Sequence, residues 1–507
     1  MFPVLYEINT RCWLRGLADE CGHRVTLGNV PDPLFEQWRR LGFTHIWLMG
    51  AWSSGPLARA QALTHASLQQ SYSEALPGWA EADVAGSPYA IADYRIAESL
   101  GGEEELKAFR EKLRSYGMKL VLDFVPNHLG VDHPWLRLRP ELFVQSPAPM
   151  PETFAQETSA GKVWLAHGKD PYFAAWTDTA QLDYRRANTQ AAMIELLHSL
   201  AERCDGLRCD MAMLLLSDVF ARTWERFPIA TAPTPAEFWQ TAIPAIKSAN
   251  PGFLFLAESY WGLESRLLGL GFDYTYDKTL YDGLMARDAG RVQRHLLESP
   301  LELLAKSAHF LENHDEPTIA SLFSLDEHRA AALLVLGLPG MRFLHQGQLS
   351  GARRRVPVQL RRFPQEPAQA EIENLYEQLL TTLPRTVVGN GTGELLRPRA
   401  AWPENPTAQN FIVVQWQGEA PEFDLVAVNL APQPSQCYVQ LTAAGLEAHD
   451  WSMKNLLGDE RYERTGEALR SRGLYLDLPS HGAQLFHFRP QLQKTGAPQN
   501  AAAPAAA

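Results

Sequence analysis

The chain has 507 residues, more than one hydrophobic core usually supports, so two or three domains are expected. Hydrophobic residues make up 46% of it and charged residues 21%, which is typical of a globular protein and not of a disordered one. No apolar run approaches the roughly 20 residues that span a bilayer, and the net charge of -12 argues against nucleic-acid binding. We therefore expect neither a membrane nor a nucleic acid as partner.

The five cysteines are scattered and form no Cys-x-x-Cys pair; they are Cys12, Cys21, Cys204, Cys209 and Cys437. This usage predicts reduced thiols rather than a disulfide framework or a zinc site. The first residues, "MFPVLYEINTRCWLRG", lack a basic leader followed by an apolar stretch. The expected location is the cytoplasm. The oligomeric state is left open.

Eight short apolar runs typical of β-strands follow one another along the chain, and helical patterns separate them. The runs begin at Val4, His45, Lys119, Gly206, Phe253, Phe272, Ala308 and Met341. Among the helical patterns, residues 103–117 place Leu106, Phe109 and Leu113 on one face and end at Gly117. Alternating strands and helices predict an α/β fold with a parallel sheet, and eight strands predict a closed (β/α)8 TIM barrel.

The spacing of these runs also predicts the domains. The barrel is expected over 1–128 and 185–384, with a small inserted domain B after the third strand, at 129–184. Short β-type runs separated by turn residues predict a C-terminal antiparallel β-sandwich over 385–490. The low-complexity tail, 491–507, is predicted to be disordered.

Polar residues stand at the ends of four predicted strands, where packing alone does not require them. They are Asp123, Asn127 and His128 after the third strand, Arg208 and Asp210 in the fourth, Glu258 after the fifth, and Glu312, Asn313, His314 and Asp315 after the seventh. A buried carboxylate is costly unless it is paired or hydrogen-bonded. Taken singly, Arg208 and Asp210 are more simply a structural ion pair, Glu258 a solvated carboxylate at a strand end, and His128 and His314 hydrogen-bonded structural histidines. Together, at the carboxyl ends of barrel strands, they indicate an active site.

The segments that hold these residues resemble a known family. "DFVPNH", "GLRCD", "LAES" and "ENHD" resemble, in order, the four signature regions of the α-amylase superfamily, glycoside hydrolase family 13. "SPYAIADYRI" (87–96) resembles the stretch that precedes the first region, and the resemblance extends from about Val4 to Leu383. It implies a glycosidase that acts on an α-glucan or oligosaccharide by a retaining mechanism.

The resemblance also implies roles for individual residues. Asp210 corresponds to the nucleophile, Glu258 to the acid/base and Asp315 to the third carboxylate; Arg208, His128, His314 and Tyr89 correspond to substrate-binding positions. A retaining glycosidase needs two carboxyl groups about 5–5.5 Å apart. Arg208 is expected to lower the pKa of Asp210, and the apolar neighbours of Glu258 are expected to raise its pKa so that it stays protonated.

The sequence departs from the family pattern after the nucleophile. Met213 and Leu214 stand where starch-cleaving members have Lys-His, and neither side chain can donate a hydrogen bond or carry a charge. The leaving-group subsite is therefore expected to be built from other residues. We expect that the protein requires no cofactor, and we consider a calcium requirement doubtful. Asn127 corresponds to a calcium ligand in calcium-dependent members, and it is either that or a brace for its loop. The basic run 351–363 is either solvated surface or a contact to an anionic group.

The favoured function is hydrolysis of α-glucosidic bonds in maltodextrin-like or short α-glucans through a covalent glycosyl-enzyme intermediate. The same carboxylates serve α-glucan transglycosylases and disaccharide isomerases of the trehalose synthase type, which remain the alternative. A non-catalytic sugar-binding barrel is less expected, because all three carboxylates are present. The aromatic residues of the insert either form its own core or line sugar subsites; they are Trp135, Trp164, Tyr172, Phe173 and Trp176.

Overall fold

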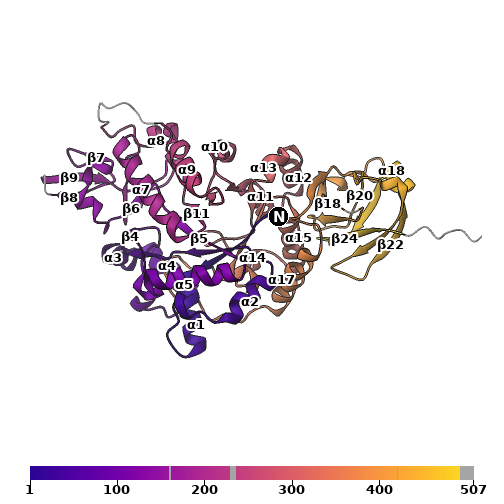
Figure 1. Cartoon of the computed structure of the whole chain (residues 1–507), viewed down its shortest axis with the longest axis horizontal. Coiled ribbons are helices and arrows are strands. Elements are labelled where there is room, and N and C mark those ends of the chain that lie inside the picture. Colours follow the sequence, from indigo (N-terminus) through magenta and orange to yellow (C-terminus); the bar gives the residue numbers. More distant parts are fainter. Residues whose placement is uncertain (159–160, 229–235, 420, 492–507) are drawn as a thin grey trace, which may run out of the picture.

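The computed structural model describes residues 1–158, 161–228, 236–419 and 421–491. Its centre is a closed barrel of eight parallel strands that follow one another around the barrel in chain order (Figure 1). The strands are β1 (Val4–Asn9), β2 (His45–Met49), β5 (Lys119–Phe124), β11 (Gly206–Cys209), β12 (Leu254–Ala257), β13 (Tyr274–Tyr276), β14 (Ser307–His309) and β15 (Met341–His345). The predicted TIM barrel is confirmed, strand by strand.

Burial on both faces explains why these strands read as continuous apolar runs rather than as alternating ones. Every residue of β1 is buried, as is every residue of β2, β11 and β12. The outer faces pack against helices that include α5 (Gly102–Ser115), α7 (Ala187–Arg203) and α15 (Leu325–Gly337). Helix α5 has the predicted buried face, and Gly117 follows it with φ of 77°, a left-handed conformation that glycine adopts without strain.

Small sheets occupy the connection between β5 and β11. Strands β6 (His128–Gly130) and β10 (Thr179–Gln181) pair antiparallel, and β7 (Gln145–Ser146), β9 (Gly161–Ala166) and β8 (Thr153–Thr158) form a second antiparallel sheet. Figure 1 shows these strands at the end of the molecule opposite the C-terminal sheets. The other long connection, after β2, holds β3 (Trp52–Ser54), α3 (Pro56–Thr64) and α4 (Ala66–Ala75), and β3 pairs with β4 (Ile91–Ile96).

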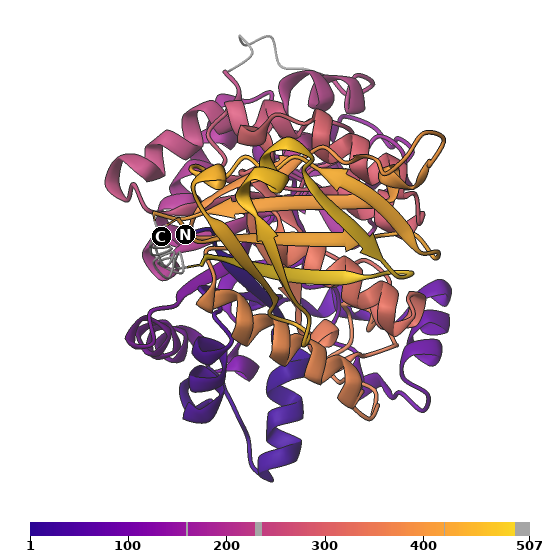
Figure 2. The ribbon, with the colours of Figure 1, turned by 90° about the vertical axis from the view of Figure 1, so that its right-hand side faces the viewer.

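The C-terminal part consists of two antiparallel sheets. One has the order β16-β18-β19-β24-β21-β22 and the other the order β17-β20-β23. The strands are β16 (Thr392–Leu396), β17 (Arg399–Ala400), β18 (Phe411–Gln417), β19 (Phe423–Asn429), β20 (Ser435–Val439), β21 (Asp450–Asn455), β22 (Arg461–Thr465), β23 (Leu474–Leu478) and β24 (Ala483–Pro490). A hydrophobic cluster contributed by both sheets fills the space between them, so the predicted sandwich is confirmed (Figure 2). The predicted disordered tail lies, apart from Gln491, outside the described residues.

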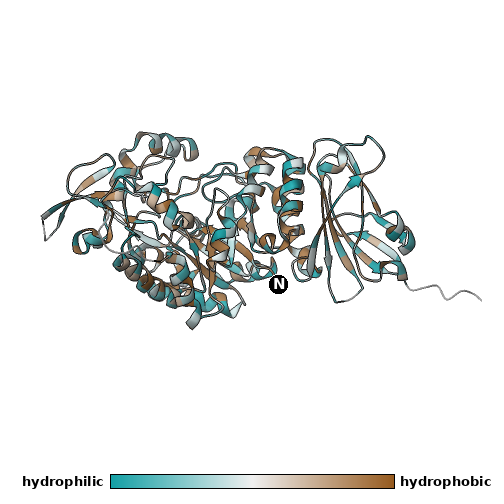
Figure 3. Ribbon diagram, turned by 90° about the horizontal axis from the view of Figure 1, so that it is seen from above, coloured by the Kyte–Doolittle hydropathy of each residue, from teal (hydrophilic) through white to brown (hydrophobic). Residues whose placement is uncertain are grey.

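Helix α15 joins the sandwich to the barrel. The indole Nε1 of Trp416 in β18 donates a hydrogen bond to Gly337 O at 2.8 Å. A Cβ at Gly337 would lie 2.9 Å from Val426, so only glycine permits this close approach. Seen from above, the sandwich lies at one end of the molecule, beside helices of the barrel (Figure 3). Within the described ranges, no helix has the length and apolar character needed to cross a membrane.

Candidate active site

The carboxyl ends of neighbouring barrel strands bring the predicted site residues together. Arg208 in β11 lies in register with Asp123 in β5 on one side and with Leu256 in β12 on the other. Asp210 directly follows β11, and Glu258 directly follows β12. Parallel strands end at one face of a barrel, so residues far apart in the sequence meet there.

Arg208 lies at the centre of this group. Its side chain is buried, and its Nη1 and Nη2 atoms each lie 2.6 Å from a carboxylate, Oδ1 of Asp210 and Oε2 of Glu258 respectively. Its Nε donates to the hydroxyl of Tyr276 at 3.3 Å. A planar guanidinium can serve two acceptors at once, whereas a lysine ammonium is a single point. One cation therefore holds both predicted catalytic carboxylates.

Aromatic rings enclose this cation. The guanidinium carbon of Arg208 lies 5.3 Å from the ring centre of Trp47, 5.4 Å from that of Tyr89 and 5.9 Å from that of Tyr276. Such contacts stabilise a cation most where water is excluded. The apolar walls also strengthen the attraction between Arg208 and its carboxylates by lowering the local dielectric.

Glu258 has the environment of a general acid. Burial raises its pKa, the charge of Arg208 opposes that rise, and the nearby negative charge of Asp210 adds to it. The main-chain N–H of Met211 donates to Oε2 at 2.7 Å, and the hydroxyl of Tyr260 donates to Oε1 at 2.7 Å. These bonds fix the orientation of the carboxyl group. The raised pKa agrees with the prediction from its apolar neighbours.

The pKa of Asp210 differs from the prediction. Arg208 lowers it through its charge and its hydrogen bond, as expected, but burial is the larger effect and the net direction is upward. Asp210 is 7% exposed, and desolvation disfavours its charged form. The negative charge of Asp315 acts in the same direction. The sequence shows the arginine beside Asp210 but not the depth at which both are buried.

His314 links the third carboxylate to the first barrel strand. Its Nε2 lies 3.0 Å from Oδ2 of Asp315 and 2.7 Å from the hydroxyl of Tyr89, and its Nδ1 contacts the carboxylate of Glu7. Burial opposes its protonation, but the charges of Asp315 and Glu7 prevail and raise its pKa well above the usual range. Tyr89 also stacks on the imidazole ring, with ring centres 5.4 Å apart.

Asp315 is open to solvent, with 51% of its side chain exposed. Partial desolvation opposes ionisation of the Asp315 carboxyl group. The charge and hydrogen bond of His314, together with the charges of Arg208 and Arg355, outweigh this effect and lower the pKa of Asp315 to about 2. Arg355, from the basic run after β15, donates to the main-chain oxygen of Asp315 at 2.7 Å. Asp315 is therefore an ionised, accessible carboxylate at neutral pH.

Asn127 and His128 lie where β6 begins. Gln181 Nε2 donates to the side-chain oxygen of Asn127 at 3.0 Å and to its main-chain oxygen at 2.8 Å, which favours the brace. Burial lowers the pKa of His128 to about 4, and its ring centre lies 5.1 Å from that of Trp176. In the described part of the chain, no group of three His, Cys, Asp or Glu side chains is placed to hold a metal ion.

Asp123 has a structural position. Its Oδ1 accepts a hydrogen bond from Trp47 Nε1 at 3.2 Å, its Oδ2 accepts one from the N–H of Gly50 at 2.9 Å, and Oδ1 lies 3.9 Å from Arg208. Burial raises its pKa to about 7. It connects β5 to β2 behind Arg208.

The residues that replace Lys-His do not line the site. Met213 and Leu214 lie in the short helix η5 (Ala212–Leu215) and are buried in the core. Met211, just before this helix, adopts a left-handed conformation with φ of 43° and directs its N–H to Glu258. A main-chain donor thus occupies this side of the Glu258 carboxyl group.

Several neighbours of the predicted catalytic group were not predicted from the sequence: Glu7, Trp47, Tyr260 and Tyr276. Two of them carried a signal. Glu7 is a carboxylate within the otherwise apolar run "VLYEIN", and Tyr260 stands two residues after Glu258, the spacing that puts side chains on one side of an extended segment. Trp47 and Tyr276 resemble ordinary strand residues, so the sequence offers no sign of their role.

A parallel barrel with buried, cation-bridged carboxylates at the carboxyl ends of its strands defines a class of (β/α)8-barrel enzymes in which chemistry takes place at that face. The family model for the α-amylase catalytic domain matches residues 38–356. The chain belongs to the α-amylase family.

Individual relatives are distant. Alpha-amylase MalA from Haloarcula japonica is 26% identical over 281 residues, which cover 54% of this chain and 38% of that protein. Alpha-amylase 3 from Dictyoglomus thermophilum is 23% identical over 388 residues, covering 71% and 66%. The chain thus spans less than two thirds of each of these relatives.

Solved structures match along nearly the whole chain. The noncanonic maltogenic α-amylase AmyB from Thermotoga neapolitana superimposes with a TM-score of 0.66 at 18% identity, covering 96% of this chain and 98% of that one. An α-amylase from Lactobacillus plantarum gives the same TM-score and coverage at 21% identity. At these identities the likeness establishes the fold alone.

Proposed function

We propose that the protein hydrolyses α-glucosidic bonds in maltodextrin-like or short α-glucans, with retention of configuration. One observation carries the proposal: a single buried guanidinium, that of Arg208, contacts the carboxyl groups of both Asp210 and Glu258 at 2.6 Å. A double displacement requires two neighbouring carboxyl groups that flank the scissile bond, about 5–5.5 Å apart, and a shared guanidinium keeps two such groups close together.

In this mechanism Asp210 is the nucleophile. Its carboxylate attacks the anomeric carbon while Glu258 donates a proton to the leaving oxygen, and a covalent glycosyl-enzyme ester forms. Glu258, now ionised, then removes a proton from a water molecule that attacks the same carbon and releases Asp210. Arg208 remains beside both carboxylates, so it balances negative charge on whichever of the two is ionised.

Asp315 and His314 serve the sugar on the other side. Asp315 is ionised and half exposed, so it can accept hydrogen bonds from sugar hydroxyls and stabilise positive charge that develops on the ring. His314 is positively charged between two carboxylates and donates from both ring nitrogens. Tyr89, stacked on His314, offers its ring to the sugar face.

We also propose that this chemistry needs no metal cofactor. The side-chain oxygen of Asn127, which corresponds to a calcium ligand in some family members, is held by Gln181. The proton transfers assigned above use side chains of the chain itself. Activity unchanged by a chelator supports this proposal, and loss of activity restored by Ca²⁺ contradicts it.

Trapping the intermediate tests the mechanism. The Glu258→Gln variant is incubated with 5-fluoro-α-D-glucosyl fluoride, whose fluoride leaves without an acid, and the protein is digested for mass spectrometry. We expect one sugar adduct, on the peptide that contains Asp210, and none in the Asp210→Asn variant. An adduct on another carboxylate, or an inverted anomer as the first product by NMR, would refute the assignment.

Products from defined substrates test the reaction class. Wild-type enzyme is incubated with maltoheptaose and with trehalose, and the products are separated by chromatography. Shorter oligosaccharides or glucose alone support hydrolysis. Products longer than the substrate, or maltose from trehalose, would show that a sugar rather than water is the acceptor and would replace hydrolysis by transfer or isomerisation.

A further inference from the structure

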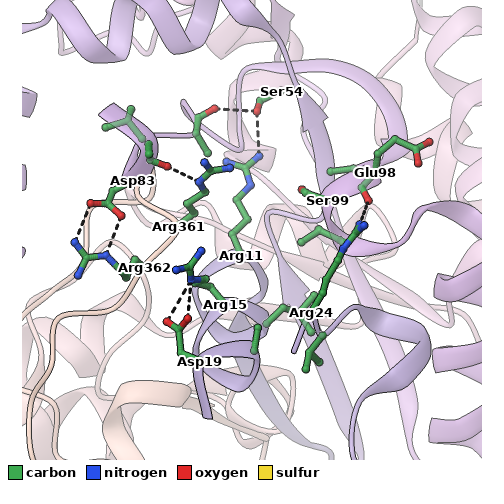
Figure 4. Close-up of a pocket in the computed structure, with 18 of the residues that line it drawn as sticks. Arg11, Arg15, Asp19, Arg24, Ser54, Asp83, Glu98, Ser99, Arg361 and Arg362 are labelled. Atoms are coloured by element: carbon green, nitrogen blue, oxygen red, sulfur yellow. Dashed lines mark hydrogen bonds and ion pairs between the residues drawn. The ribbon is translucent and has the colours of Figure 1, made fainter. Parts of the chain in front are cut away.

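The structure contains a hollow whose lining does not include the predicted catalytic carboxylates (Figure 4). Its volume is about 1020 Å³, and it is bordered by α1 (Thr10–Cys21), β3, the helical turn η3 (Glu98–Leu100), the segment 82–85 and the segment 361–362. We call this hollow the flank pocket. None of Asp210, Glu258 and Asp315 lines it.

Arginine dominates the lining. Six arginines border the flank pocket, against three carboxylates, those of Asp19, Asp83 and Glu98; the arginines are Arg11, Arg15, Arg24, Arg59, Arg361 and Arg362. This positive excess is unexpected in a chain of net charge -12. A concave surface lined by one sign of charge concentrates ligands of the opposite sign.

Only two of these arginines have a carboxylate partner in the described ranges. Arg15 pairs with Asp19 at 3.0 Å, and Arg362 pairs with Asp83 at 2.8 Å through both its Nε and Nη2 atoms. The other four donate only to neutral oxygens. Arg59, for example, donates to two main-chain carbonyls, which accounts for it as a brace of its loop.

Arg11 and Arg361 are not accounted for in that way. Arg11 is only 9% exposed, and it donates to Gly86 O at 2.9 Å and to Trp52 O and the Ser54 hydroxyl at 3.4 Å, all of them neutral acceptors. Arg361 uses only its Nε atom, which donates to a main-chain oxygen at 2.6 Å. Its two terminal nitrogens have no partner in the described part of the chain.

The guanidinium groups of Arg11 and Arg361 lie beside each other in the lining of the pocket. Figure 4 shows Arg361 beside Arg11, with the hydroxyl of Ser54 next to them. Burial, to which the positive charge of Arg361 adds, lowers the pKa of Arg11 to about 10. An anion between the two arginines would remove this repulsion, and the planar fork of a guanidinium matches phosphate oxygens in pairs.

We propose that the flank pocket binds a small phosphorylated ligand, with Arg11 and Arg361 contacting its phosphoryl oxygens. The remaining volume exceeds what inorganic phosphate needs, so the ligand has an organic part. The second alternative for the basic run 351–363, contact with an anionic group, thus applies to its end at Arg361. The site is separate from the one proposed for glycosidic bond cleavage.

Isothermal titration calorimetry on the full chain tests the proposal. The probes are glucose 6-phosphate, inorganic phosphate and glucose at one ionic strength. We expect glucose 6-phosphate to bind, inorganic phosphate to bind more weakly and compete with it, and glucose at the same concentrations to give no heat at this site. The Arg361→Gln variant is expected to bind glucose 6-phosphate at least about tenfold more weakly, since a charged pair of hydrogen bonds is lost.

Two matched variants locate the site. Arg39→Gln removes the same charge from an exposed position of α2 (Asp32–Arg40), away from the pocket, and is expected to bind like the wild type. Arg354→Gln removes it from a different hollow, beside His314, and is also expected to bind like the wild type. Absence of binding by all three probes overturns the proposal. Equal weakening in Arg361→Gln and Arg39→Gln, or weakening in Arg354→Gln alone, overturns it as well.

Discussion

Replacing Arg208 by glutamine tests whether this one cation stabilises both the barrel and the reaction. The substitution leaves Asp210 and Glu258, which are 7% and 3% exposed, without the group that contacts each of them at 2.6 Å. Removing one partner of a buried ion pair typically costs about 3–5 kcal/mol. Because the unfolding entropy grows with chain length, a chain of 507 residues loses about 1 °C of its unfolding midpoint per kcal/mol, so the midpoint should fall by about 3–5 °C.

Activity should fall for a separate reason. Arg208 is the main influence that lowers the pKa of Asp210, so its loss moves that pKa further up and leaves less of Asp210, the proposed nucleophile, ionised at pH 7. We expect kcat to fall by about 10²-fold or more. The fall should be smallest at high pH, where Asp210 ionises despite its raised pKa.

Two variants serve as controls for Arg208→Gln. Arg208→Lys keeps the charge, but a lysine can reach only one of the two carboxylates. The free energy of unfolding should therefore fall by about 1.5–3 kcal/mol, the contribution of one charged hydrogen bond. Arg222→Gln breaks an exposed pair with Asp218, where the side chain of Arg222 is 75% exposed, and should cost at most about 1 kcal/mol. Circular dichroism melts and initial rates are measured on the same preparations. An Arg208→Gln midpoint within 2 °C of the wild type would refute the reasoning.

Three further substitutions test the surroundings of the site. Tyr260→Phe removes a hydrogen bond that lowers the pKa of Glu258, so the basic limb of the kcat/KM profile should move to higher pH, and kcat should fall about tenfold. Trp261→Ala removes an exposed indole ring three residues beyond Glu258, whose centre lies 5.0 Å from that of a tyrosine ring of the insert. The KM for long maltooligosaccharides should rise about tenfold, while the KM for the shortest substrate should change little. Asp277→Asn removes a buried carboxylate that accepts hydrogen bonds from two histidines, at 2.9 and 3.0 Å. This substitution should lower the free energy of unfolding by about 3 kcal/mol at pH 7. The control Asp282→Asn, at a more exposed ion pair, should lower it by at most about 1 kcal/mol.

The Asp277 prediction has a definite pH dependence. The hydrogen bonds and charges of the two histidines outweigh the opposing effect of burial and lower the pKa of Asp277. The stabilisation is therefore fully present above the carboxyl pKa of the unfolded chain, near 3.8, and is lost as pH falls through the lower pKa of the folded state. The stability difference between wild type and Asp277→Asn should shrink in acid; a constant difference from pH 7 down to 3 would contradict the reasoning.

For Tyr260→Phe and Trp261→Ala, the following results would contradict the predictions. An unchanged pH profile in Tyr260→Phe would show that its hydroxyl does not act on Glu258. A rise in KM that is the same for short and long substrates in Trp261→Ala would show that the ring supports the active-site loop and not an extended sugar chain.

The sequence by itself determined the order of the barrel strands and showed which of them end in carboxylates. A buried strand can be recognised from its own residues, because a strand that is buried on both faces is a continuous apolar run, as in "VLYEIN". The four polar strand ends were legible because a charged residue inside an apolar run is costly and therefore informative. Once the strands form a parallel barrel, their carboxyl ends necessarily lie at the same face, so these residues come together.

Only the tertiary structure decided how these groups act on one another. The net rise in the pKa of Asp210 depends on desolvation by many residues, and no spacing in the sequence records it. The same holds for Arg208 reaching Glu258, 50 positions further on, and for Glu7 contacting His314, 307 positions away. Electrostatic effects depend on distance and on the dielectric around each charge, and both are properties of the folded chain.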